Sequence, residues 1–296
     1  MVKPKLEGIF TPHITPFTRD GEVDESALRT CVKFWIEGGI SGLVPCGSNG
    51  EAPYLSREER RRVIEIVIDE VNGKVPVIPG TGSMSTRETI LFTRDADDLG
   101  ADAALVVTPF YFKLSNKELY EHYRAVIEAL DLPIIVYNVP RFTGFSLEPV
   151  VISQLVSKYD DVIGVKDSSG NINQITEIIR LVGKKISVLA GTGDAILPTL
   201  TLGGKGAVVA VANVAPKACV DLYKAFKEGN EEEAKRIQLQ VSRINEVLVK
   251  KYNQLSAIKE ALNVLGCQAG YPRRPALPLE EEAKENLKKV LASCFS

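Results

Sequence analysis

Eight short apolar runs alternate with amphipathic stretches along the first three quarters of this chain, and no other feature constrains the fold more. The intervening stretches open with Ser-x-x-Glu capping boxes at Ser56, Ser85 and Ser115, which predict helix starts. Eight strands alternating with helices indicate an α/β fold, a closed (β/α)₈ TIM barrel. An open doubly wound sheet is the alternative, but the first turn, at 15–21, lacks a Gly-x-Gly-x-x-Gly fingerprint. The predicted strands are 8–15, 43–46, 75–79, 103–108, 134–137, 162–166, 187–190 and 207–212.

The strand pattern stops at about Lys227, and the remaining sequence is helical. Helices are expected at 231–251, 256–265 and 279–291, with a Pro-rich link at 271–278. We therefore expect a barrel domain at residues 1–228 and a three-helix C-terminal domain at 229–296. The acidic runs at 231–233 and 280–282 suit helix N-termini and are assigned no site role.

Composition excludes several classes of function. The formal net charge of -2 provides no electrostatic footprint for nucleic acid. No apolar run approaches the roughly 20 residues of a membrane span, and the first residues lack the apolar core of a signal peptide, which predicts a cytoplasmic protein. The cysteines are odd in number and lack metal-ligand spacing, so they indicate buried or incidental thiols in a reducing compartment; they are Cys31, Cys46, Cys219, Cys267 and Cys294.

The same composition argues against metal chemistry. Histidine occurs only at His13 and His122, too few and too far apart to indicate a zinc site. We predict neither a metal nor a cofactor, although a carboxylate-rich magnesium site stays open at this stage.

Lys166 ends the buried run at 162–166 and is the candidate nucleophile. An ammonium at the end of a buried strand is costly, and burial lowers a lysine's pKa toward the range in which the free amine attacks a carbonyl. The alternative is structural: the side chain extends into solvent or pairs with Asp167.

Other strand ends supply polar groups that would meet Lys166 on the carboxyl face of a barrel. The turn Gly-Ser-Asn-Gly-Glu at 47–51 offers donors from Ser48 and Asn49 for a carboxylate, although a purely structural tight turn is equally compatible. Tyr137 ends the strand before that of Lys166, and Tyr111 follows the strand at 103–108. Taken singly each tyrosine suits the core, but together with Ser48 they suit the proton relay that imine chemistry needs.

Strand seven ends at 191–194, where Asp194 favours an N-cap over a catalytic acid.

Six segments in this order resemble the dihydrodipicolinate synthase and N-acetylneuraminate lyase family of class I aldolases: 8–17, 47–51, 106–111, 137–140, 164–167 and 212–216. The resemblance covers essentially the whole chain. It implies a pyruvate-handling lyase on a TIM barrel with a helical C-terminal domain, usually a homotetramer.

The resemblance also implies residue roles. The position of Lys166 forms the Schiff base with pyruvate, Tyr137 transfers protons, and Ser48 and Tyr111 complete the relay. Ser48, Asn49 and Val208 line the pyruvate pocket, the first two holding its carboxylate.

The sequence departs from the synthase pattern where the second substrate binds. Synthases carry Tyr-Asn-Val-Pro-x-Arg-Thr-Gly, whose arginine binds the second substrate's carboxylate, whereas Phe142 stands in that place here. A phenyl ring cannot replace a guanidinium–carboxylate pair, and the candidate substitutes are Arg141, one residue earlier, or a residue from a neighbouring subunit. The turn at 47–51 and the segment Lys-Asp-Ser-Ser-Gly at 166–170 also resemble those of 4-hydroxy-2-oxoglutarate and 2-keto-3-deoxy sugar-acid aldolases.

The sequence therefore predicts a Schiff-base aldolase that cleaves a 4-hydroxy-2-oxo acid to pyruvate and an aldehyde. A 4-hydroxy-tetrahydrodipicolinate synthase, which condenses pyruvate with aspartate semialdehyde, is the nearer alternative. A catalytically silent ligand-binding barrel is the distant one. The identity of the aldehyde stays open, because it depends on the surroundings of Phe142 and Gly191 and on the loop after the fourth strand.

Overall fold

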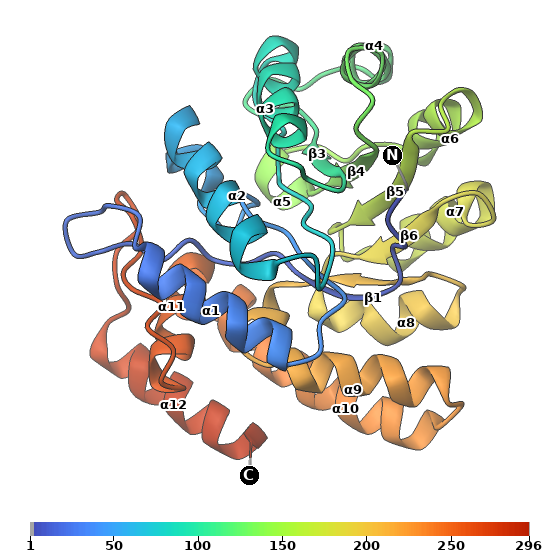
Figure 1. The fold of residues 1–296 in the computed structure, drawn as a ribbon. Helices are drawn as coiled ribbons and strands as arrows, with labels where there is room; N and C mark the ends of the chain where they lie inside the picture. The colour runs from blue at the N-terminus through green and yellow to red at the C-terminus, as the bar shows by residue number, and fades with distance from the viewer. Residues whose placement is uncertain (1–2, 296) are drawn as a thin grey trace.

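The computed structural model describes residues 3–295, and within them seven strands form one parallel sheet that curls into a barrel (Figure 1). The strand order is β2-β1-β7-β6-β5-β4-β3, so chain neighbours lie side by side, as the alternating pattern predicts. The strands are β1 Gly8–Thr11, β2 Gly42–Leu43, β3 Ala104–Val107, β4 Ile134–Asn138, β5 Val162–Asp167, β6 Ser187–Ala190 and β7 Gly206–Val208.

The segment predicted as a strand at 75–79 is irregular, yet it closes the ring. It forms single bridges, from Val77 to Leu43 of β2 and from Gly80 to Leu105 of β3. The carbonyl oxygen of Pro76 accepts from Leu43 N at 3.0 Å, and that of Pro79 accepts from Leu105 N at 2.8 Å. Proline has no N–H to donate to a ladder, which explains why regular strand pairing fails here although the carbonyl groups still bond on both sides.

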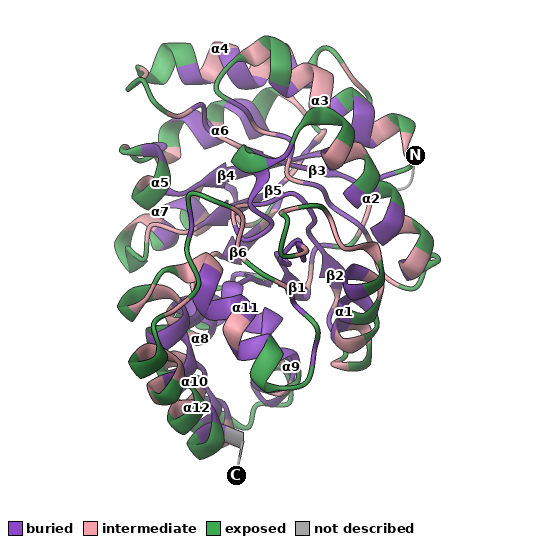
Figure 2. Cartoon of the chain, turned by 90° about the vertical axis from the view of Figure 1, so that its left-hand side faces the viewer, coloured by how far each residue is buried: buried purple, intermediate pink, exposed green. Residues whose placement is uncertain are grey.

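Helices surround the barrel, and their apolar faces cover the strands (Figure 2). The predicted capping boxes are complete at Ser56 and Ser115, whereas Ser85 accepts from Glu88 N without the reciprocal bond. The Glu88 carboxylate instead accepts from Ser83 Oγ at 2.8 Å. The helices of this part are α1 Glu25–Glu37, α2 Arg57–Val71, α3 Thr86–Asp98, α4 Asn116–Ile127, α5 Pro140–Thr143, α6 Pro149–Lys158, α7 Ile172–Val182, α8 Ile196–Thr201 and α9 Pro216–Lys227.

A separate apolar cluster fills the barrel interior. Alternate residues of each strand point inward, so Ile135 and Tyr137 of β4 meet Leu105, Leu189 and Val208 from other strands. Tyr137 thus lies at the end of a packed core, with only its outer part able to face a ligand.

The three predicted C-terminal helices are present as α10 Glu231–Asn245, α11 Gln254–Val264 and α12 Glu281–Phe295, and α10 continues into a π-helix at Glu246–Lys251. Acidic residues occupy the first turns of α10 and α12, as expected for helix N-termini. Side chains of α10, α11 and α12 belong to the same hydrophobic cluster as the barrel helices, and the division at 228/229 stays a prediction.

Within residues 3–295 no helix is both long and apolar enough to cross a bilayer. The five cysteines are unpaired and buried, as predicted.

Candidate active site

Lys166 and Tyr137 lie side by side on neighbouring strands. The β4–β5 register pairs Tyr137 with Lys166, and Lys166 Nζ lies 4.2 Å from the centroid of the phenol ring. Lys166 is only 4% exposed and Tyr137 only 5%. Burial lowers the pKa of Lys166, and contact with the Tyr137 hydroxyl partly opposes this fall.

The structural alternative for Lys166 fails on both counts. The side chain does not extend into solvent, and Asp167 points to the other side of the strand, where its carboxylate accepts from Asn138 and Gln174 at 2.8 Å each. A buried amine without a carboxylate partner is the state that favours the neutral form.

A cavity of about 380 Å³ opens beside Tyr137 at the carboxyl ends of the strands. Its size suits a small organic ligand. Its walls come from the turn after β2, the segments after β3 and β4, and the start of α11. The lining residues used below are Ser48, Ala52, Arg60, Phe110, Tyr137, Arg141, Phe142 and Gln254.

The turn 47–51 presents Ser48 to this cavity, while the Asn49 side chain faces away from it. Asn49 Nδ2 donates to Pro12 O at 2.8 Å, and its amide oxygen accepts from Gln254. The Asn49 side-chain amide, which was predicted as a donor to a carboxylate, is therefore engaged by protein partners, and only the backbone N–H of Asn49 stays a candidate.

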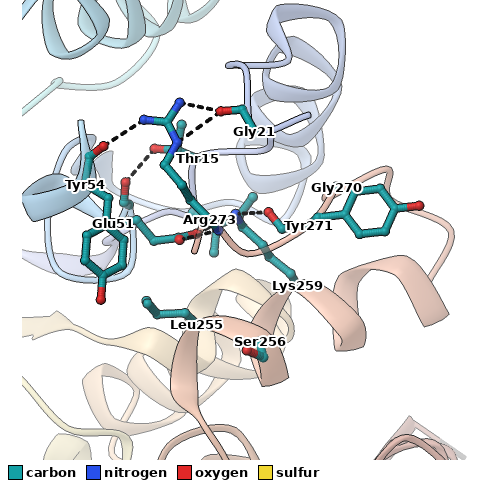
Figure 3. Close-up of polar contacts among 12 residues, drawn as sticks. Thr15, Gly21, Glu51, Tyr54, Leu255, Ser256, Lys259, Gly270, Tyr271 and Arg273 are labelled. Atoms are coloured by element: carbon teal, nitrogen blue, oxygen red, sulfur yellow. Dashed lines mark hydrogen bonds and ion pairs between the residues drawn. The ribbon is translucent and has the colours of Figure 1, made fainter. Parts of the chain in front are cut away.

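A buried ion pair that the sequence analysis did not predict joins the turn to the C-terminal helices (Figure 3). Lys259 Nζ of α11 lies 2.5 Å from Glu51 Oε1, with the two side chains 1% and 0% exposed. The same amine donates to Tyr271 O at 2.7 Å, and Arg273 N donates to Glu51 Oε2 at 2.8 Å. Glu51 has left-handed backbone, φ 57°, so these bonds hold a conformation that non-glycine residues rarely adopt. A lysine among the buried residues of α11 was the available signal.

Arg60 of α2 is a second residue that sequence reasoning missed. It is 8% exposed, its Nη2 donates to Ala52 O at 2.6 Å, and its guanidinium lies 4.5 Å from the centroid of the Phe92 ring. Its Nε and Nη1 are buried without a hydrogen-bond partner among residues 3–295. One arginine within the run Arg57-Glu-Glu-Arg-Arg-Arg62 offered no sequence signal that would single it out.

Tyr111 is not where the relay needs it within one chain. The side chain is 83% exposed, with φ 86°, and it stacks edge-on against Phe112, which is itself 71% exposed. Tyr111 does not line the cavity. A single copy brings Tyr137 and the Ser48 turn to one cavity and places Lys166 beside Tyr137, although Lys166 is not among the lining residues, and it leaves Tyr111 outside.

Arg141 and Phe142 lie at the mouth of the cavity. Phe142 is half exposed, and Arg141 Nη1 donates to Val249 O at 2.8 Å while its guanidinium lies 5.6 Å from the centroid of the Phe142 ring. One nitrogen of the Arg141 guanidinium is thus held by the π-helix.

Three other residues that the sequence analysis named, Val208, Gly191 and Asp194, contact other parts of the protein. Val208 is 2% exposed in the interior cluster that contains Tyr137, and the Gly191 carbonyl accepts from Ser168 Oγ at 3.2 Å. The prediction that Asp194 caps a helix is wrong. Its carboxylate pairs with Lys250 Nζ at 2.6 Å and accepts from Asn245 Nδ2, because the end of α10 and the π-helix that continues it lie beside Asp194.

Comparison with known proteins identifies one family over nearly the whole chain. The family model for the dihydrodipicolinate synthetase family matches residues 5–294. The 4-hydroxy-tetrahydrodipicolinate synthase of Methanothrix thermoacetophila is 42% identical over 287 residues, which cover 97% of this chain and 96% of that protein. That of Methanopyrus kandleri is 40% identical over 288 residues, covering 97% and 96% of the two chains.

A solved structure of the Acinetobacter baumannii dihydrodipicolinate synthase, complexed with pyruvate, superposes with a TM-score of 0.94 at 35% identity. The match covers 98% of this chain and 99% of that one. The fold match, the family model and the relatives coincide over nearly the full length. The chain belongs to the dihydrodipicolinate synthetase family, as the sequence resemblance indicated.

Proposed function

We propose that this protein is a pyruvate-dependent Schiff-base enzyme in which Lys166 is the nucleophile. The observation that carries the proposal is the buried Lys166 amine, 4.2 Å from the centre of the Tyr137 ring and without a carboxylate partner among the described residues. Such an amine is uncharged more often than a solvated lysine, and only the uncharged amine adds to a ketone.

The reaction begins with attack of Lys166 Nζ on C2 of pyruvate, whose carboxylate binds the Ser48–Asn49 backbone. The carbinolamine loses water, and a methyl proton leaves to give an enamine. Tyr137, adjacent to the amine, accepts and returns these protons, and Ser48 extends the relay. The enamine carbon then adds to the carbonyl of an aldehyde.

For the aldehyde we propose aspartate semialdehyde, as in 4-hydroxy-tetrahydrodipicolinate synthase. The support comes from relatives of about 40% identity that carry this name. These names favour the synthase over the retro-aldol cleavage that the sequence pattern put first.

Cleavage of a 4-hydroxy-2-oxo acid remains the second candidate, and one observation favours it. Phe142 occupies the place of the synthase arginine at the cavity mouth, and Arg141 is engaged with Val249. Both candidates form an imine on Lys166 and pass through the same pyruvate enamine, so they differ in the aldehyde that the enamine adds to or that the cleavage releases.

We also propose that Tyr111 acts in the cavity of a second copy, consistent with a homotetramer. Tyr111 and Phe112 expose two aromatic rings side by side, and Tyr111 has a positive φ, which is costly for a non-glycine residue. Contact with a second copy would compensate both costs, whereas water would not. Mixing the two inactive variants Lys166→Arg and Tyr111→Phe tests this, because a mixed assembly contains one intact site. Failure to regain activity under subunit exchange contradicts a shared site.

A substrate panel tests the function. The purified protein is assayed with pyruvate plus aspartate semialdehyde, and for cleavage of 4-hydroxy-2-oxoglutarate and of 2-keto-3-deoxygluconate, each with Lys166→Arg as the matched inactive control. Condensation faster than either cleavage supports the synthase, and the reverse order supports the aldolase. Activity that survives in Lys166→Arg contradicts both.

A further inference from the structure

The turn at 47–51, to which the proposed function assigns the pyruvate carboxylate, has a strained backbone. Two non-glycine residues with left-handed backbone lie at its ends, Cys46 at φ 54° and Glu51 at φ 57°. Such conformations are costly and persist only where the surrounding structure holds them. The backbone N–H groups of Ser48 and Asn49 make no hydrogen bond within residues 3–295, so neither donor is engaged elsewhere in the described chain. The shape of the turn therefore depends on contacts from other segments.

The C-terminal segment holds the end of this turn. Lys259 and the backbone of Arg273 both bond to the Glu51 carboxylate (Figure 3). The two donors assigned to pyruvate lie two and three residues before Glu51, at Asn49 and Ser48. A second contact is needed to fix them.

Gln254, the first residue of α11, makes this second contact. Its Nε2 donates to Asn49 Oδ1 across 205 positions of the sequence. Pro12 determines the direction of the bond, because its carbonyl oxygen can only accept and the Asn49 NH₂ group must face it. The Asn49 oxygen then faces α11, where a donor is required, and the Gln254 amide supplies one.

This bond joins a cavity residue to a buried one. Gln254 is partly exposed and lines the same cavity as Ser48 and Tyr137, whereas Asn49 is 3% exposed and does not line it. Removing the Gln254 donor leaves a buried amide oxygen unsatisfied unless the turn moves. Either result changes the turn and leaves Tyr137, on β4, in place.

We propose that Gln254 is a positioning residue for pyruvate: through Asn49 it holds the turn in the conformation that presents the Ser48 and Asn49 N–H groups to the pyruvate carboxylate. This assignment rests on the proposed function and deepens it, because it gives the C-terminal helices a part in substrate binding. Lys166 and Tyr137 act on the reacting atoms. Gln254 accordingly controls the affinity for pyruvate and not the rate of the chemical steps.

Gln254→Met tests this, because it keeps the length of the side chain and removes the donor. Gln240→Met is the matched control, since Gln240 Nε2 also donates across the C-terminal helices, to Cys294 O, and does not line the cavity. Borohydride trapping at a series of pyruvate concentrations gives the half-saturating concentration and the maximal rate separately. One hydrogen bond changes an equilibrium by about 2- to 12-fold.

We expect the half-saturating pyruvate concentration to rise by that factor in Gln254→Met. The maximal trapping rate and the KM of the aldehyde should stay at their wild-type values, and Gln240→Met should match wild type throughout. An unchanged half-saturating concentration overturns the proposal. A rise confined to the KM of the aldehyde also overturns it, because Gln254 would then contact the second substrate. If Gln254→Met does not fold, Gln254→Ala takes its place.

A double-mutant cycle tests whether Gln254 acts through Asn49. Asn49→Ala removes the acceptor of the bond and should itself raise the half-saturating pyruvate concentration. Adding Gln254→Met to Asn49→Ala should raise it no further, because no bond is left to lose. Additive effects of the two changes, or an Asn49→Ala protein that saturates like wild type, overturn the proposal.

A thermal measurement separates this proposal from the one on which it rests. Pyruvate without borohydride should raise the melting temperature of wild type more than that of Gln254→Met, followed by Trp35 fluorescence. If pyruvate raises the melting temperature but is not trapped on Lys166, the proposed function is wrong and the difference between the two proteins still tests Gln254. An equal rise in both proteins overturns the role of Gln254 alone. If pyruvate is neither trapped nor stabilising, both proposals fail.

Discussion

Replacing Lys259 with methionine should destabilise the protein strongly, because it leaves Glu51 buried without its cation. The side chains of Lys259 and Glu51 are 1% and 0% exposed, so water cannot solvate the Glu51 carboxylate once the lysine is removed. Burial lowers the pKa of Lys259 to about 8, while Glu51 opposes the fall, so the amine is mostly charged at neutral pH. Removing one member of such a pair costs about 3 to 5 kcal/mol.

For a chain of this length that cost corresponds to a fall of about 5 to 8 °C in melting temperature. Urea unfolding followed by the fluorescence of Trp35, the sole tryptophan and fully buried, measures it directly. Lys217→Met, which removes a surface pair with Asp221, is the control and should unfold with the wild-type midpoint.

The double variant Glu51→Met with Lys259→Met sharpens this prediction. Replacing both members of a buried ion pair with apolar groups of similar volume destabilises a protein far less than removing one member alone. The double variant should therefore be more stable than Lys259→Met alone. A Lys259→Met protein that unfolds at the same urea concentration as Lys217→Met would refute the reasoning, since the pair would then contribute nothing.

Three further predictions follow from single side chains. Tyr137→Phe should lower kcat by about 10²- to 10⁴-fold through loss of proton transfer, and pre-steady-state kinetics should show slowed imine formation with KM little changed. His13 is fully buried, and burial lowers its pKa from 6.5 to about 4. The unfolded state therefore binds a proton more readily than the native state below pH 6.5, and the free energy of unfolding falls by about 3 kcal/mol as the pH drops from 6.5 to 4. Urea midpoints of His13→Phe should fall less over that interval than those of wild type, and parallel curves would contradict this. Phe142→Arg should raise kcat/KM for aspartate semialdehyde relative to Phe142→Leu; equal values would mean that the mouth of the cavity does not contact the acceptor.

The order of the strands and the pairing of Lys166 with Tyr137 could be predicted because both depend on local pattern. In a parallel barrel, residues that end neighbouring strands meet at one face, so sequence position suffices. The segment at 75–79 shows the limit of the same reasoning. Its apolar run marks the right place, but Pro76 and Pro79 remove the donors that a regular strand requires.

The supporting residues could not be predicted, because their partners are distant in sequence. Lys259 meets Glu51 across 208 positions, and only the packing of α11 against the barrel brings them together. In the sequence Arg60 cannot be distinguished from the neighbouring arginines, and only the packing of α2 shows that it is the buried one. Asp194 has the local pattern of a helix cap, yet Lys250 of the C-terminal segment binds it. Tyr111 fits the family pattern, and its exposure becomes informative only once the chain is folded.

The most direct test of the account is whether pyruvate becomes attached to Lys166, and at which pH. Incubation with pyruvate and borohydride, followed by peptide mass mapping, should place one reduced adduct on the peptide that contains Lys166. The rate of trapping should rise with pH and level off well below 10.5, because burial lowers the pKa of this amine. An adduct on another lysine, or a rate that still rises at the pKa of a solvated lysine, would contradict the claim that a buried amine beside Tyr137 carries the chemistry.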